Sequence, residues 1–314
     1  MSTLSELSKL STLVADTADF ELLKKHPVTD ATTNPSLVLA ASKTEGYADI
    51  IREGRESLKD GKDMQACVQR ILARAGQQIL SIVPGRVSAE VDARLSFDTQ
   101  GTIAYAYKLM EEFAALGVDS NRILIKIAST WEGLAAAKYL ESQGIHCNMT
   151  LIFHLEQALV AAENGVTLIS PFVGRILDFY KAKDPEGDFA GAKDPGVISV
   201  HEIYNTLKSK GYNTQVMAAS FRNTGEILEL AGSDLLTISP ALLDQLAEDT
   251  TAVEQKLNYE GEIIKPVTDL DAAQREAAFR WAMNDDAMAH DKLADGIRRF
   301  AADQVTMEKA LSEG

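Results

Sequence analysis

The sequence predicts an α/β protein of the (β/α)8 TIM-barrel class, with additional helices, notably at the C-terminus. Short apolar or β-branched segments alternate with longer amphipathic ones, and eight of the short segments fit within 314 residues. Such alternation indicates parallel strands joined by crossover helices, and eight of these favour a closed barrel over an open sheet. We expect one domain over residues 1–314, with C-terminal helices from about residue 271 packing on the barrel.

The strands are predicted from runs of apolar and β-branched residues. Helical periodicity fills most of the intervals, as in residues 63–80 and 102–117. The interval between the second and third strands is long enough for more than one helix. The predicted strands span residues 12–17, 29–34, 86–93, 123–129, 147–153, 168–174, 215–221 and 235–241.

After the eighth strand, two helices that no strand follows are predicted over residues 271–284 and 287–311. Trp281 and Phe300 within them are candidates to cap the barrel or to meet another subunit. A stretch rich in Gly, Asp and Pro at residues 181–196 is predicted to be a loop. This loop is a candidate for a mobile cover over the site.

The composition excludes several classes of partner. Lys and Arg total 31 against 46 Asp and Glu, and the net charge of −15 repels nucleic acid and anionic membranes. A local arginine cluster can still bind a small anionic substrate. Cys67 and Cys147 are too few for a disulfide framework or a cysteine metal site. With no basic, apolar leader in residues 1–16 and no apolar stretch of spanning length, we expect a soluble cytoplasmic protein.

Lys126 is the unusual residue of the fourth predicted strand, "ILIKIAS". Side chains in a strand alternate between two faces, so the isoleucines of this strand share one face and Lys126 lies on the other. The isoleucine face suits packing against outer helices, which directs Lys126 into the barrel. Lys126 is then either a structural ion-pair partner of Glu90 or Asp16, or a catalytic group.

The same alternation gives most other strands a polar side chain on one face near the C-terminal end. In barrels this end carries the active site, because the strand tips and the loops after them converge there. Converging buried polar groups are costly unless they bind one another or a ligand, which favours a site. The aligned residues are Asp16 in the first strand; Asp30, Thr32 and Asn34 in the second; Ser88, Glu90 and Asp92 in the third; Asn148 and Thr150 in the fifth; Ser170 and Phe172 in the sixth; Ser220 and Arg222 in the seventh.

A lysine among apolar residues indicates Schiff-base chemistry. Desolvation disfavours its charged form, and a neutral amine attacks carbonyl carbons. The protonated imine withdraws electrons, so a neighbouring C–C bond can break. This needs a carboxylate for the substrate hydroxyl and an acid/base for the loss of water, and Asp16 and Glu90 are the candidates. Asn34 and Asn148 carry amides suited to sugar hydroxyls.

Two arginines predict a phosphate site. Arg175 and Arg222 follow the sixth and seventh strands, where helices begin, and Ser220 is close to Arg222. Arginine near a helix N-terminus holds phosphate through bidentate contacts and backbone N–H groups.

The segments "TDATTNPSLV", "VSAEVDARLSFDT", "RILIKIASTWEGL", "CNMTLIFHLEQA", "ISPFVGRILDFY" and "AASFRN" resemble, nearly word for word, the signature segments of the transaldolase family. The resemblance covers essentially the whole chain. It implies transfer of a dihydroxyacetone unit from sedoheptulose 7-phosphate to glyceraldehyde 3-phosphate in the pentose phosphate pathway. It also implies that neither a metal nor an organic cofactor is needed, and that the protein is a homodimer.

The resemblance further implies roles for individual residues. Lys126 would be the Schiff-base lysine and Asp16 the acid/base for C–C cleavage. Glu90 would act in imine formation through a water that Thr150 helps to hold. The dihydroxyacetone moiety would be bound by Asn34, Asn148 and Ser170, and the phosphate by Arg175, Ser220 and Arg222.

Three alternatives to this reading differ in what they require. Fructose 6-phosphate aldolase has the same lysine chemistry but releases free dihydroxyacetone, and it tends to carry a tyrosine where this sequence has Phe172. A metal-dependent hydrolase barrel needs a His-x-His pair, which the five histidines do not form. A barrel that only binds a sugar phosphate would be expected to lack one of Lys126, Asp16 and Glu90.

Overall fold

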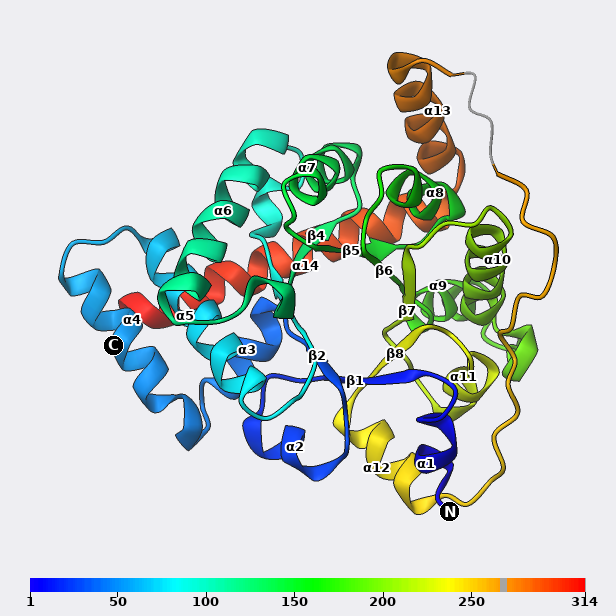
Figure 1. Cartoon of the computed structure of the whole chain (residues 1–314), viewed down its shortest axis with the longest axis horizontal. Helices are drawn as coiled ribbons and strands as arrows, with labels where there is room; N and C mark the ends of the chain where they lie inside the picture. Colours follow the sequence, from blue (N-terminus) through cyan, green and yellow to red (C-terminus); the bar gives the residue numbers. More distant parts are fainter. Residues whose placement is uncertain (266–269, 314) are drawn as a thin grey trace.

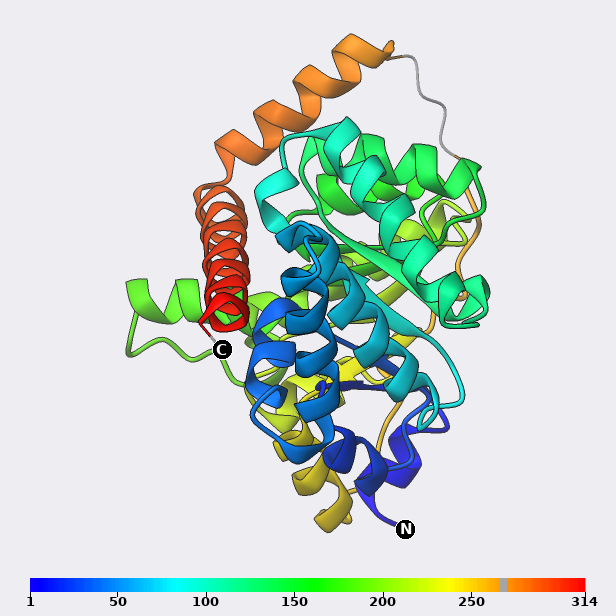
Figure 2. The same cartoon turned by 90° about the vertical axis from the view of Figure 1, so that its left-hand side faces the viewer.

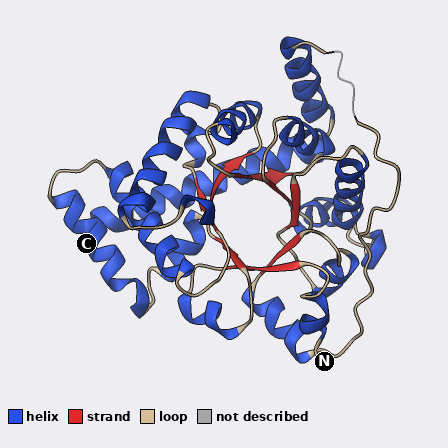
Figure 3. Ribbon diagram, viewed as in Figure 1, coloured by secondary structure: helices blue, strands red, loops and turns tan. Residues whose placement is uncertain are grey.

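The computed structural model, which describes residues 1–265 and 270–313, contains a closed barrel of eight parallel strands in sequential order (Figures 1 and 3). This confirms the predicted fold class. The strands are β1 (Thr12–Asp16), β2 (Asp30–Thr32), β3 (Val87–Glu90), β4 (Ile123–Ala128), β5 (Cys147–Ile152), β6 (Leu168–Pro171), β7 (Gln215–Ala218) and β8 (Leu235–Ile238).

The helices surround the barrel, and α3, α4 and α5 fill the long interval between β2 and β3 (Figure 1). The described helices are α1 (Thr3–Leu7), α2 (Phe20–Lys25), α3 (Pro35–Ala41), α4 (Ala48–Lys59), α5 (Met64–Leu80), α6 (Thr99–Ala115), α7 (Trp131–Ser142), α8 (Leu155–Glu163), α9 (Gly174–Lys183), α10 (Pro195–Ser209), α11 (Thr224–Glu229), α12 (Pro240–Glu248), α13 (Ala272–Asp285) and α14 (Ala287–Ser312).

Several predicted strands extend too far at their C-terminal ends. The second strand was predicted to reach Asn34, but Asn34 is the N-cap of α3, and its Oδ1 accepts from the Leu37 N–H at 2.9 Å. An Asn followed by proline is a helix-start signal, and the extended backbone of an N-cap resembles strand. The same error occurs after β6 and β8, where the predictions include the first residues of α9 and α12.

The predicted loop over residues 181–196 is shorter than expected. Helix α9 continues to Lys183, and α10 begins at Pro195. Asp194 caps α10, because its Oδ1 accepts from the Gly196 N–H at 2.7 Å and Pro195 occupies the first helical position.

The barrel has separate inner and outer apolar layers. Ile123, Ile125 and Ile127 join the outer layer beneath the helices, which confirms the predicted phase of β4. A distinct inner cluster consists of Val14, Leu124, Leu168, Met217 and Leu235.

Helix α14 crosses one end of the barrel, as two perpendicular views show (Figures 1 and 2). Its Phe300 is buried against the barrel mouth, so this residue caps the barrel. Trp281 on α13 is 67% exposed and does not cap it. In the described part of the chain, no helix is both long and apolar enough to cross a membrane.

The inner cluster gives a stability prediction. Leu168 is fully buried inside the barrel, and Leu168→Ala removes packing that its neighbours cannot refill. We expect a loss of about 2–5 kcal/mol in the free energy of unfolding, measured by urea denaturation. Leu22→Ala, at a position 39% exposed, should cost less than about 1 kcal/mol. Equal losses in the two variants would contradict the assignment of Leu168 to the barrel core.

Candidate active site

A cavity of about 90 Å³ opens at the C-terminal ends of the strands, beneath Phe300 of α14. Most residues predicted for the site line this cavity. They are Asp16, Asn34, Lys126, Thr150, Ser170, Phe172, Arg175 and Ser220.

A larger cavity of about 610 Å³ lies on the outer surface of the helical layer, beside α7, α8 and α13. Its charged Arg275 is already paired with Glu156 and Glu163. The smaller cavity in the barrel mouth is the better candidate, because buried titratable groups of opposite charge converge there.

Lys126 lies at the centre of the barrel mouth and is only 5% exposed. The register between strands places Glu90 of β3 and Asn148 of β5 beside it. Lys126 Nζ lies 3.1 Å from Glu90 Oε2 and 3.4 Å from the Thr33 carbonyl oxygen. The ion-pair partner of Lys126 is therefore Glu90. Glu90 itself does not line the cavity but lies behind the lysine.

Two carboxyl groups flank this one lysine. Burial raises the pKa of Asp16, which Lys126 and a 2.9 Å hydrogen bond from Thr32 Oγ1 partly offset. Burial also raises the pKa of Glu90, again opposed by Lys126. The Glu90–Lys126 contact is an ion pair, and Glu90 Oε2 has no hydrogen-bond donor within the described residues. Raised pKa values make both carboxyls better proton acceptors than an exposed carboxylate.

A hydrogen-bonded chain of side chains fixes the amide on β5. Ser170 Oγ donates to Asn148 Oδ1 at 2.6 Å, and Asn148 Nδ2 donates to Ser88 Oγ at 3.0 Å. Asn148 lies behind Ser170 rather than on the cavity wall. Within the described chain, the buried Thr150 Oγ1 has no hydrogen-bond partner, although it lines the cavity. A polar substrate or a water held there would satisfy this hydroxyl.

Arg175 is a second positively charged residue that lines the cavity. Its guanidinium lies 5.1 Å from the centre of the Phe172 ring and 5.6 Å from that of Phe300. Burial, followed by the positive charges of Arg299 and Arg222, lowers the pKa of Arg175. This accumulation of positive charge favours an anion.

Ser220 and Arg222 occupy the loop after β7. Ser220 Oγ accepts from Arg222 Nη1 at 3.4 Å, and Ser220 lines the cavity. Arg222 does not line it, and its guanidinium forms a bidentate pair with Asp178 of α9, at 3.1 and 2.6 Å. The structure therefore brings Ser220 to the site and leaves Arg222 at the rim.

The sequence pattern alone does not explain why Ser220 faces the cavity. Met217 belongs to the inner cluster, so strict alternation would place Ser220 on the outer face. The backbone of Ser220 is left-handed, with φ of 64°, and this turns its side chain back to the cavity. Gly174 makes the arrangement possible, because a Cβ there would lie 2.5 Å from the Ser220 carbonyl oxygen.

Two further residues, Thr32 and Phe300, line the cavity, although the sequence assigns them no part in the chemistry. Thr32 contacts both Asp16 and Thr237, the latter at 2.7 Å between hydroxyl oxygens. The position of Thr32 on the polar face of β2 is the sequence signal that points to this contact. Phe300 comes from a helix remote in sequence, and its ring centre lies 5.8 Å from Lys126 Nζ.

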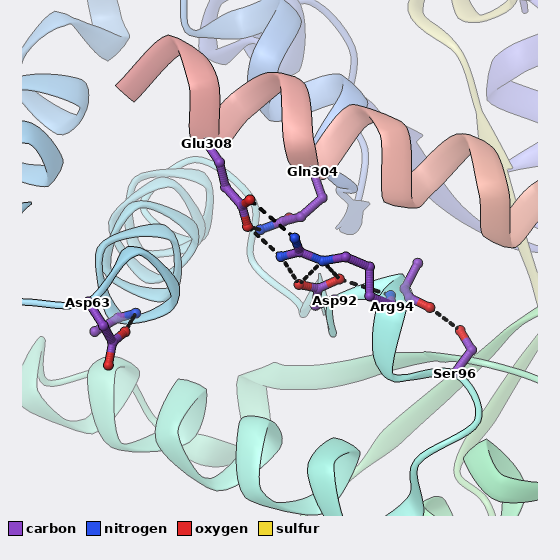
Figure 4. Close-up of polar contacts among 8 residues, drawn as sticks. Asp63, Asp92, Arg94, Ser96, Gln304 and Glu308 are labelled. Atoms are coloured by element: carbon purple, nitrogen blue, oxygen red, sulfur yellow. Dashed lines mark hydrogen bonds and ion pairs between the residues drawn. The ribbon is translucent and has the colours of Figure 1, made fainter. Parts of the chain in front are cut away.

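A network of charged side chains holds α14 over the mouth (Figure 4). Arg94, in the loop after β3, donates to both oxygens of Asp92 and to Glu308 of α14. Gln304 Nε2 donates to Glu308 at 3.2 Å. Beside this network, Ser36 of α3, which follows the neighbouring strand β2, hydrogen bonds with Asp303 of α14. These contacts tie Phe300 to the barrel that carries Lys126.

Comparison with known proteins gives one consistent result. The model of the family "Transaldolase/Fructose-6-phosphate aldolase" matches residues 13–311. The chain is 52% identical to a transaldolase of Shewanella pealeana, covering 99% of this chain and 98% of that protein. It is 53% identical to a transaldolase A of Pasteurella multocida and 52% identical to a transaldolase of Haemophilus influenzae, each covering 98% of both chains.

The network of Figure 4 predicts how firmly α14 is held. Arg94→Ala leaves the Asp92 carboxylate, which is 7% exposed, without its cation. We expect α14 docking to weaken by about 1–2 kcal/mol, because an unsatisfied buried acceptor is costly. Hydrogen exchange of the α14 amides should then accelerate roughly tenfold. Arg52→Ala, which breaks only exposed pairs on α4, is the control. Unchanged exchange in α14 would show that the network does not hold the helix.

Proposed function

We propose a transaldolase reaction for this protein, because the chain belongs to the transaldolase/fructose-6-phosphate aldolase family. A dihydroxyacetone unit passes from sedoheptulose 7-phosphate to glyceraldehyde 3-phosphate, and the products are erythrose 4-phosphate and fructose 6-phosphate. The observation that carries the proposal is the buried Lys126, flanked by Glu90 and Asp16 at the mouth of a barrel.

The lysine must lose a proton before it attacks a carbonyl. In the ion pair, Glu90 Oε2 is 3.1 Å from Lys126 Nζ and accepts that proton, directly or through a water that the Thr150 hydroxyl holds. Burial raises the pKa of Glu90, which makes its carboxylate a better acceptor for this proton. The amine then adds to C2 of the ketose, and loss of water from the carbinolamine, assisted by Glu90, gives the protonated imine.

Cleavage of the C3–C4 bond requires a base at the C4 hydroxyl. Asp16 lines the cavity and interacts electrostatically with Lys126, and its raised pKa suits proton abstraction. The electron pair of the broken bond moves into the imine, which becomes an enamine, and erythrose 4-phosphate leaves. The enamine carbon attacks the aldehyde of glyceraldehyde 3-phosphate, Asp16 returns the proton, and hydrolysis of the new imine frees fructose 6-phosphate.

Substrate binding divides between two ends of the cavity. We assign Asn34, Asn148 and Ser170 to the dihydroxyacetone moiety. Asn34 and Ser170 line the cavity together with Lys126, and Asn148 is the register partner of Lys126 and accepts a hydrogen bond from Ser170. We assign the phosphate to Arg175, Ser220 and Arg222. An arriving phosphate would satisfy Arg175 Nη1, which has no partner within the described residues.

Aldolase-type release of dihydroxyacetone is the second candidate, since the family includes both activities. Phe172 favours transfer over release. Its ring packs edge-on against Phe153, with centres 5.5 Å apart, and presents no hydroxyl to hold a water near the enamine. Slow protonation of the enamine leaves time for the acceptor aldehyde to arrive.

We also propose a homodimer in the cytoplasm. The resemblance to the longer members of the family supports the dimer, and Trp281 supplies an exposed aromatic residue on α13. Cys67 and Cys147 are both free thiols, which suits a reducing compartment.

The roles of Lys126 and Asp16 give the first activity prediction. Lys126→Met should abolish formation of fructose 6-phosphate from sedoheptulose 7-phosphate and glyceraldehyde 3-phosphate. Asp16→Asn should lower kcat roughly 10²–10⁴-fold with KM changed much less, because a proton-transfer group is lost. Asp60→Asn, an exposed acid, is the control. Full kcat in Asp16→Asn would remove Asp16 from the mechanism.

Phe172 gives the second activity prediction. Phe172→Tyr places a hydroxyl beside the enamine, and we expect faster release of free dihydroxyacetone from fructose 6-phosphate without acceptor, with slower transfer. An enzymatic assay for dihydroxyacetone measures the release. If the ratio of release to transfer is unchanged, Phe172 does not control the choice between the two outcomes.

A further inference from the structure

Two buried carboxyl groups lie behind the loop that carries Ser220 and Arg222. Asp194, the N-cap of α10, is 1% exposed, and Glu226 of α11 is 2% exposed. Helix α11 packs against the turn at Gly191–Lys193 that leads into Asp194, and the two carboxyl groups are close enough for each to shift the pKa of the other. The reaction derived above uses neither residue.

One shared proton would satisfy the hydrogen-bonding capacity of this pair. Glu226 Oε2 accepts from the backbone N–H of Arg222 at 2.6 Å, and Asp194 Oδ1 accepts from the Gly196 N–H at 2.7 Å. With both groups ionised, Glu226 Oε1 has no donor within the described part of the chain. A carboxylic acid on one residue supplies the missing donor, so one proton satisfies the pair and removes one of two repelling charges.

The pair is coupled to the phosphate-binding loop through tight backbone contacts. A Cβ on Gly196 would lie 2.2 Å from the Val173 carbonyl oxygen, so α10 begins directly against the start of α9. At the same point the Gly174 N–H donates to the Ser220 carbonyl oxygen at 3.0 Å. The loop that carries Ser220 is thus held by Gly174 on one side and by the Glu226 bond to the Arg222 N–H on the other.

We propose that Glu226 is a positioning residue for phosphate binding, and that one proton shared with Asp194 holds Ser220 and Arg222 in the arrangement that binds the substrate phosphate. This inference rests on the proposed function, which assigns Ser220 and Arg222 to the phosphate. Loss of the proton sets two buried carboxylates against each other and loosens the loop. The affinity for phosphorylated substrates then falls as the pH rises.

The burial of Glu226 and Asp194 and the charges around them set the pH range over which the pair loses its proton. Burial first, and the neighbouring Asp194 as well, raise the pKa of Glu226 to about 7, against the opposing hydrogen bond from the Arg222 N–H. Burial also raises the pKa of Asp194, while its bonds to the N–H groups of α10 and the charge of Lys181 on α9 lower it.

The other charged groups near the pair are engaged elsewhere. The Arg222 guanidinium is paired with Asp178 of α9. His201 of α10 contacts the Glu229 carbonyl oxygen of α11 at 2.8 Å rather than a carboxyl group.

The direction of the pH dependence follows from the linkage between proton binding and folding. The folded protein holds a proton on Glu226 that the unfolded chain, with a pKa near 4.5, has already lost. The stabilisation by this proton is therefore present at low pH and is lost as the pH rises towards about 7. The loop should be tight below neutral pH and looser above it.

The test measures KM for fructose 6-phosphate as donor and Ki for inorganic phosphate between pH 6 and 8.5. In the unmodified protein we expect KM and Ki each to rise from pH 6 to pH 8.5. This rise should exceed the rise in the variants described next by a factor on the order of five. Glu226→Gln keeps an acceptor for the Arg222 N–H and gives Asp194 a permanent donor. In this variant the extra rise should disappear, with kcat at pH 6 within about twofold of the original. Fructose, which lacks the phosphate, serves as the control donor, and its KM should follow the same pH profile in both proteins.

Two further variants make the test decisive. Asp194→Asn preserves the cap of α10 and donates to Glu226, so it should flatten the profile in the same way if Glu226→Gln does not fold. Glu229→Gln removes a neighbouring acid of α11 outside the pair and should keep the original profile. An unchanged pH dependence in both Glu226→Gln and Asp194→Asn would overturn the proposal. If inorganic phosphate binds at no pH and fructose 6-phosphate has no advantage over fructose, the phosphate assignment itself fails instead.

Discussion

The ion pair between Lys126 and Glu90 is the constraint on which the rest of the site depends. Two charges placed inside a barrel lose much of their hydration, and their mutual attraction offsets this only when the geometry is well fixed. Pairing of β3 with β4 supplies that geometry, because it places Glu90 directly beside Lys126. The transfer of one proton within this pair converts it into a neutral amine and a carboxylic acid ready for carbonyl chemistry.

The division of the barrel into layers keeps this pair in place. The inner cluster of Val14, Leu124, Leu168, Met217 and Leu235 fills the barrel beside the site, so the charged groups are confined to the mouth. Helix α14 lies over that mouth and brings Phe300 close to both Lys126 and Arg175. A limited access of water at this position strengthens the electrostatic interactions of the reaction and slows protonation of the enamine.

The alternation of short apolar segments with helical ones predicted the fold class, and the alternation of side chains within the strands predicted most of the polar residues that line the cavity. It placed Lys126 inward and the isoleucines of β4 outward, as the structure shows. It could not choose between Glu90 and Asp16 as ion-pair partner, because that choice depends on the register between strands. It also could not explain Ser220, whose left-handed backbone breaks the alternation. Contacts between segments distant in sequence, such as Phe300 over Lys126 and Asp194 against Glu226, were beyond the reach of local patterns.

The most direct test of the central claim is to trap the intermediate on Lys126. The protein is incubated with fructose 6-phosphate without an acceptor aldehyde, reduced with borohydride, and mapped by mass spectrometry. We expect a mass increment of a reduced dihydroxyacetone unit on Lys126, which reports the imine, the C–C cleavage and the retained three-carbon unit together. A folded protein with a competent substrate and no adduct on Lys126 would contradict the mechanism and leave its ion pair with Glu90 a purely structural role.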